Sequence, residues 1–327
     1  LLAYLLVGNL LAQAQHNVLA EKAAKQYEKL AYVDAIKTYE RLAEKGYKSE
    51  ELFQKLGNAY YFNADLEKAA KWYAALFEMN QEQEPEYLYR YAQTLKAVGD
   101  YVQSDALMAQ FTKNSSADLR SKQFENSKDY LAQIKENSGR YELTHLKINS
   151  PYSDYGSTVS NSTLVFASSR DTGSVFQRKH KWTNESFTCL YGSKIEGDTC
   201  LDALKFATEI NSKFHESSAV FSKDGQTMYF TRNNFNKGKK GKDANRMTLL
   251  KIYRAQLVNG SWKNVTELPF NSNEFNTAHP ALSANETMLY FASDRPGGYG
   301  KSDLWQVELL TDGTFGTPVN LGNSINT

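Results

Sequence analysis

The sequence predicts a multidomain chain in which an α-helical solenoid precedes an incomplete β-propeller of about three blades. Three observations predict this order. The length of 327 residues suits two domains, the first third repeats an amphipathic helix pair, and short alternating strands repeat from about residue 141. We expect a signal-peptide remnant over residues 1–14, helical repeats over 15–137 and the propeller, incomplete at its C-terminal end, over 141–327.

Residues 1–14 have the features of a secretory signal without its basic segment. An apolar run leads into Ala12-Gln13-Ala14, which has the small-x-small form of a cleavage site. The run is shorter than the roughly 20 residues that a membrane helix needs. We expect export and a mature chain that starts near Gln15, and a buried first helix is the alternative.

The helical repeat is clearest in the pair that begins at Glu50. Its large, small and aromatic positions follow the tetratricopeptide pattern: Phe53, Leu56, Gly57, Tyr60, Ala69, Tyr73 and Leu76. The corresponding positions recur in the preceding and following pairs: Leu19, Ala23, Ala35, Tyr39 and Leu42, then Leu88, Tyr91, Ala92, Leu95, Ser104, Met108 and Phe111. Turns are expected at residues 63–65 and 99–100, and residues 118–136 should cap the array. A generic helical bundle is the alternative.

Such arrays present a concave groove lined by the first helix of each pair. Positions one turn away from the packing positions are predicted to form a protein-binding groove: Tyr27, Gln54, Asn58, Tyr61, Tyr89 and Gln93. Aromatic and amide side chains suit a peptide or a protein loop. Glu21, Glu51 and Glu86 argue against a clamp for a C-terminal carboxylate, and an ordinary solvated surface remains the alternative. We further expect that replacing Tyr61 and Tyr89 weakens binding without affecting folding.

The β repeat consists of hairpins that are followed by two further strands. Related hairpins span residues 158–166, 219–230 and 280–291, and Asp224-Gly225 supplies a tight turn. Third strands are expected at 190–191, 252–254 and 304–306, and fourth strands at 261–263 and 314–316. Four strands in a repeating unit of about 60 residues are typical of a propeller blade; a β-sandwich is the alternative. Long insertions are expected at Asp171–Ser186 and Asn233–Met247.

The segment from His279 to Trp305 resembles the WD40-like propeller repeat of periplasmic proteins. It has a proline before the first strand and the loop Ser293-Asp294-Arg295-Pro296-Gly297-Gly298 before Asp303-Leu304-Trp305. Helical repeats, this propeller and a signal peptide together resemble a group of Bacteroidetes envelope proteins that carry a C-terminal OmpA-like peptidoglycan-binding domain. Members of the group are associated with type IX secretion and gliding motility.

The resemblance implies a non-enzymatic scaffold in the periplasm, associated with the outer membrane or the cell wall. Its implied partners are envelope proteins, bound by the helical groove and the propeller face, among them an outer-membrane barrel. Peptidoglycan would be bound by a domain outside these residues. The alternative is the substrate-gating propeller of a hydrolase whose catalytic domain lies beyond residue 327, and a glycan-binding propeller is a third hypothesis.

No residue pattern in the sequence indicates catalysis or a cofactor. The chain has no Gly-x-Ser-x-Gly element, and its five histidines are scattered singly. The 38 basic and 37 acidic residues give a net charge of +1, which argues against a nucleic-acid partner. The lysine run from Lys237 to Lys242 is interpreted as a solvated loop. We therefore expect no enzyme, cofactor or metal site.

The two cysteines, Cys189 and Cys200, flank a predicted turn at residues 193–197. A disulfide bond between them would close a short loop, and an exported protein meets the oxidising conditions that preserve it. Two unrelated buried thiols are the alternative, and both interpretations stay open at this point.

Overall fold

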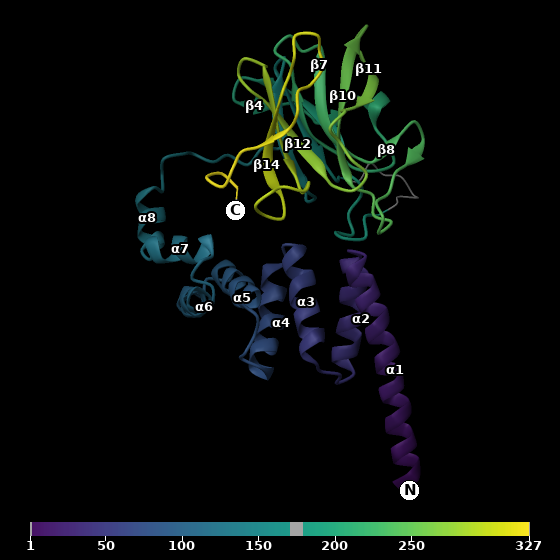
Figure 1. The fold of residues 1–327 in the computed structure, drawn as a ribbon, viewed down its shortest axis with the longest axis vertical. Helices are drawn as coiled ribbons and strands as arrows, with labels where there is room; N and C mark the ends of the chain where they lie inside the picture. The colour runs from purple at the N-terminus through teal and green to yellow at the C-terminus, as the bar shows by residue number, and fades with distance from the viewer. Residues whose placement is uncertain (1, 171–178, 327) are drawn as a thin grey trace. The chain divides into compact units, whose positions relative to one another are not determined.

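The structure is a computed structural model that describes residues 2–170 and 179–326, with side chains described from residue 15 onward. It divides into two compact units, and each is considered by itself. The helical unit comprises Leu1–Glu142 together with His180–Asn184, and the β unit comprises Leu143–Lys179 and Glu185–Thr327. The chain is therefore α-helical first and β-stranded afterwards (Figure 1).

The helical unit is a succession of helices in which each of the first six packs against the helix that follows it. Its helices are α1 (Leu2–Glu28), α2 (Tyr32–Glu44), α3 (Glu50–Phe62), α4 (Leu66–Met79), α5 (Pro85–Ala97), α6 (Tyr101–Asn114), α7 (Leu119–Asn126) and α8 (Tyr130–Glu136). The predicted turns fall between α3 and α4 and between α5 and α6. Helix α1 runs continuously through the predicted cleavage site, and Leu1 lies outside the described residues.

Short polar side chains fix where several helices begin. Ser49 accepts a hydrogen bond from the Leu52 amide, and Asp65 and Asp100 accept bonds from the amides of Lys68 and Gln103. These caps satisfy backbone N–H groups that have no partner inside the helix. The N-cap residue of α2, Ala31, has no side-chain oxygen and makes no such bond.

The predicted packing positions form the core of the helical unit. Ala23, Ala35, Leu56, Ala69 and Tyr73 are all fully buried. A β-carbon added to Gly57 would lie 2.5 Å from the ring of Tyr73. The missing side chain of Gly57 therefore lets α3 and α4 approach closely, as the repeat pattern predicts.

The described residues of the β unit form three antiparallel sheets of four or five strands, besides one separate two-stranded hairpin. The first contains β1 (Asp154–Ser160), β2 (Thr163–Ser168), β3 (Cys189–Glu196), β4 (Thr199–Cys200) and β5 (Leu204–Lys205). The second contains β6 (Glu216–Phe221), β7 (Thr227–Asn233), β10 (Leu250–Val258) and β11 (Ser261–Glu267). The third contains β12 (Thr277–Leu282), β13 (Met288–Ser293), β14 (Asp303–Glu308) and β15 (Val319–Asn320).

The structure corrects one expectation about the β region and adds detail to its insertions. The described sheets are all open, and none of them closes into a barrel. The fourth strand of the third sheet is β15 instead of residues 314–316, where only a single bridge joins Phe315 to Leu309. The insertion after Asn233 forms a small hairpin of β8 (Phe235–Asn236) and β9 (Lys239–Lys240), while residues 171–178 of the other insertion lie outside the described residues.

Of the two interpretations left open for Cys189 and Cys200, the structure has the separate thiols. Both cysteines are free. The turn follows Glu196, so that Cys200 lies opposite Ile195, whereas Cys189 lies at the start of β3 opposite Ser168. At ~3.3 Å per residue this places the two thiols far outside disulfide reach.

An arginine recurs at one position of each sheet. The three arginines are Arg170, Arg232 and Arg295. Each donates a hydrogen bond to a backbone carbonyl in the segment before its sheet. Each also contacts the first residue of the first strand of its sheet, through an ion pair in the first two sheets and a hydrogen bond in the third. Each guanidinium also lies about 5 Å from the centroids of two rings in its own sheet. The first residues of these strands are Asp154, Glu216 and Thr277.

Candidate functional site

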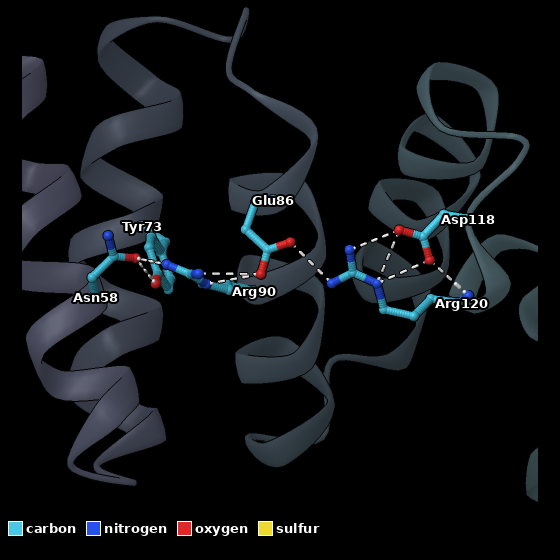
Figure 2. A network of polar contacts seen from close by, with 6 residues as sticks. All are labelled: Asn58, Tyr73, Glu86, Arg90, Asp118 and Arg120. Carbon is cyan, nitrogen blue, oxygen red and sulfur yellow. Dashed lines mark hydrogen bonds and ion pairs between the residues drawn. The ribbon is translucent and has the colours of Figure 1, made fainter. Parts of the chain in front are cut away.

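A chain of polar contacts crosses the helical unit from α3 to α7 (Figure 2). The Asn58 side-chain oxygen accepts hydrogen bonds from Tyr73 Oη at 2.8 Å and from Arg90 Nη1 at 2.7 Å. Arg90 also pairs with Glu86 on the same helix at 3.2 Å. The other oxygen of Glu86 accepts a bond from Arg120 Nη1 at 3.0 Å.

The chain of contacts ends at the start of α7. Asp118 caps this helix through the Arg120 amide at 2.8 Å and also pairs with the Arg120 guanidinium at 2.8 Å. Asn58, Tyr73, Glu86, Arg90, Asp118 and Arg120 are called the arginine network below. Two cations and two carboxylates alternate along it, so their charges balance.

Aromatic rings support both arginines of the network. The Arg90 guanidinium lies 4.9 Å from the centroid of the Phe62 ring and 5.9 Å from that of Tyr61. The Arg120 guanidinium lies 4.3 Å from the centroid of Tyr89. Stacking and ion pairing each hold the guanidinium in place. The side chain therefore loses little further conformational entropy when a ligand binds to it. The Arg120 side chain is 33% exposed, against 13% for Arg90, so Arg120 is the more accessible cation.

The network changes the acid–base properties of its members. The hydrogen bonds from Arg120 lower the pKa of Asp118, and the bonds to Asp118 raise the pKa of Arg120. Burial raises the pKa of Tyr73, and it raises the pKa of Tyr27 to about 12. All these shifts favour the protonation states found at neutral pH, so the network keeps its charge pattern there.

The structure brings together four of the six residues of the predicted groove. Asn58 is the centre of the arginine network and Tyr27 lies near it, while Tyr61 and Tyr89 lie beside the two arginines. Gln54 instead bonds Gln83 at 2.9 Å in a separate polar cluster. Gln93 is half-buried on α5, outside the network.

Three of these residues are partly or fully buried. Asn58 is 5% exposed, so its side chain is a structural hydrogen-bond centre. Tyr61 and Tyr89 are half-buried and pack against the helical core, and the Tyr89 ring lies 5.5 Å from that of Phe111. Replacing Tyr61 and Tyr89 would therefore remove packing contacts of the first helices as well as any contact with a partner.

Sequence reasoning missed Arg120 and Asp118. Both lie in the predicted capping segment, outside the repeated helix pairs, where no repeat position indicates a role. Helix α7 brings them to Glu86 of α5, 34 residues earlier in the chain. The one usable signal is local: Asp118 stands directly before an amphipathic segment, as an N-cap residue does.

The described residues contain no group of His, Cys, Asp and Glu side chains that could hold a metal ion. Among the described helices, none has the length and apolar character needed to cross a membrane. The basic run at Lys237 to Lys242 lies around the tip of the β8–β9 hairpin.

Comparisons with known proteins give weak likenesses. No protein-family model and no curated protein matches the chain. The type III secretion translocator chaperone SycD of Yersinia enterocolitica is 18% identical, with a TM-score of 0.28, over 40% of this chain and 94% of its own. A puromycin-hydrolyzing peptidase of Mycobacterium tuberculosis is 14% identical, with a TM-score of 0.32, over 56% of this chain and 25% of its own. Both scores are too low to support an argument about function.

Proposed function

We propose that this protein is a non-enzymatic scaffold whose helical unit binds a polypeptide segment of a partner protein beside Arg120. The observation that carries the proposal is the arginine network, in which a partly exposed guanidinium is held on a tyrosine ring between two carboxylates. Arginine and tyrosine are the residues most often found at the energetic centres of protein interfaces.

The charge balance of the network defines the partner more closely. Glu86 and Asp118 already neutralise both arginines, which disfavours a free C-terminal carboxylate as the ligand. The partly exposed guanidinium of Arg120 carries N–H groups and a flat face, which suit backbone carbonyl groups and flat side chains. A protein loop with backbone and aromatic contacts therefore fits better than an acidic tail.

The finer description of the fold belongs to the same proposal. We infer a tetratricopeptide array for the helical unit, supported by its buried repeat positions and by Gly57 against Tyr73. We also infer that the three sheets are blades of an open, incomplete WD40-like propeller, supported by the recurring arginine. The place of this scaffold in the bacterial periplasm, beside outer-membrane proteins or the cell wall, and its link to peptidoglycan rest on the resemblance.

The proposal is tested by capturing envelope proteins with the full chain. Arg120→Ala should reduce capture of the specific partner at least tenfold, because it removes the accessible cation. Its far-UV CD spectrum and melting temperature should change little, since the side chain is partly exposed. Arg140→Ala is the matched control, because Arg140 is exposed and lies outside the network. Equal capture by wild type and Arg120→Ala would refute the proposed site.

A further inference from the structure

A short segment from much later in the chain belongs to the helical unit. Residues His180–Asn184, which follow strand β2 in the sequence, group with the helices and not with the sheets. The Asn184 amide donates a hydrogen bond to the His180 carbonyl at 2.8 Å, so the segment forms one tight turn. Trp182, within this turn, packs against the helical core.

The turn supplies hydrogen-bond partners that the helices lack. Helix α2 has no side-chain cap at Ala31, and its Val33 amide donates to the Lys181 carbonyl at 3.3 Å. The indole Nε1 of Trp182 donates to the Phe62 carbonyl, in the last residue of α3, at 3.1 Å. Helix ends carry unpaired N–H and C=O groups, and this turn pairs with one of each.

Aromatic contacts complete the site around the indole. The Trp182 ring meets Tyr32 edge-on, with 5.0 Å between centroids, and Tyr32 stacks in turn on Phe62 at 5.6 Å. Tyr32 is 4% exposed. The helices thus offer this turn one hydrogen-bond donor, the Val33 amide, and one acceptor, the Phe62 carbonyl. They also offer the rings of Tyr32 and Phe62, and an edge-to-face contact between aromatic rings stabilises more than the burial of their area alone.

We propose that Tyr32, Val33 and Phe62 form a recognition site for a tryptophan-bearing turn, and that the chain's own residues 180–184 occupy this site. The segment acts as a built-in competitor, because a tethered ligand has an effective concentration on the order of millimolar. A foreign segment of the same chemistry enters only when residues 180–184 leave. Arg120 is two ion pairs away from this site: it pairs with Glu86, which pairs with Arg90, and the Arg90 guanidinium lies 4.9 Å from the centroid of the Phe62 ring.

The test uses the full chain and a fluorescein-labelled synthetic peptide of residues 179–185. Trp182→Ala empties the site, so this variant should bind the peptide at least tenfold more tightly than wild type in fluorescence anisotropy. A peptide with alanine in place of the tryptophan should bind every chain at least tenfold more weakly. Failure of the Trp182→Ala chain to bind, or equal binding of both peptides, would overturn the proposal.

Two further variants serve as controls. Lys181→Ala removes only a 3.9 Å ion pair with Asp34 between exposed side chains, so its peptide binding should match that of wild type. Arg120→Ala should also match wild type, which separates this proposal from the proposed function.

A conservative variant covers the case in which Trp182→Ala does not fold. Trp182→Phe keeps an aromatic ring and loses the indole N–H that bonds Phe62. It should bind the peptide at least threefold more tightly than wild type, and equal binding would overturn the proposal. Hydrogen exchange of the Val33 amide should also become faster in the Trp182→Phe chain. The acceptor of this amide is the Lys181 carbonyl, which is held in place less firmly once the neighbouring indole no longer bonds Phe62.

Discussion

Gly57 and Arg232 show how differently the two units hold their repeats together. In the helical unit, the absence of a side chain at Gly57 lets two helices meet over the buried ring of Tyr73. In the β unit, the long charged side chain of Arg232 on β7 pairs with Glu216 on the neighbouring strand β6, and Glu216 is fully buried. The stability of the helical unit at Gly57 depends on how the side chains fit, so a larger residue should destabilise it. The stability of the β unit at Arg232 depends on an opposite charge beside Glu216, so loss of that charge should destabilise it.

The largest expected effect comes from removing the charge in the β unit. Arg232→Met leaves the Glu216 carboxylate buried without its cation and should lower the free energy of unfolding by about 3–5 kcal/mol at pH 8. Arg295→Met is the matched variant, because its partner at the equivalent position is the neutral hydroxyl of Thr277. It should cost only about 1–2 kcal/mol. Urea denaturation measures both, and equal losses would show that the charge is unimportant.

The next effect is steric and falls on the helical unit. Gly57→Leu places atoms inside the Tyr73 ring, which is fully buried and cannot move aside. We expect a loss of about 3 kcal/mol in the free energy of unfolding, followed by far-UV CD during denaturation. Gly46→Leu is a control, since nothing lies within 4 Å of a β-carbon there, although its positive φ of 83° adds some strain. If Gly57→Leu loses no more stability than Gly46→Leu, a clash with the Tyr73 ring does not explain why position 57 requires glycine.

A smaller effect concerns the pH dependence of the β unit. Burial raises the pKa of Glu216 to about 7 from its ordinary value of 4.5. Between these values the folded chain keeps a proton that the unfolded chain releases, so this group's contribution to stability falls as pH rises from 4.5 to 7. Glu216→Gln should remove that part of the slope in denaturation series at several pH values. Parallel slopes for wild type and variant would contradict the raised pKa.

The smallest effect tests a bulge that recurs in the first strand of each sheet. Gly156, Ser218 and His279 occupy equivalent positions with positive φ, beside register shifts in strand pairing. A β-carbon on Gly156 would lie 3.1 Å from Ser218 Oγ. Gly156→Ala should therefore cost about 1 kcal/mol in the free energy of unfolding. Unchanged stability would show that the first sheet tolerates the bulge as the other two do.

The sequence predicted most of the helical unit because its repeats are local. Two of the turns between helices and the buried positions from Ala23 to Phe111 follow from periodicity and from small residues at fixed spacing. The β hairpins also followed from alternation and turn residues. The fourth strand of the third sheet was misplaced, because β15 is only two residues long and carries no alternating pattern of its own.

The candidate sites were less predictable, because their residues come from distant parts of the chain. The sequence placed Asn58, Tyr61 and Tyr89 near one another, since they share the first-helix positions of successive repeats. It did not show that Asn58 is buried or that Arg120 completes the network. Exposure depends on which neighbours cover a side chain, and no single helix carries that information.

The sequence by itself determined the order of helices and strands and the repeat positions. Both depend on patterns within a few tens of residues. Tertiary structure alone decided the separation of Cys189 from Cys200, the pairing of Arg232 with Glu216 and the docking of Trp182 between α2 and α3. Strand register and packing between distant segments set these contacts, because each is fixed by the free energy of the whole fold and not by local preference.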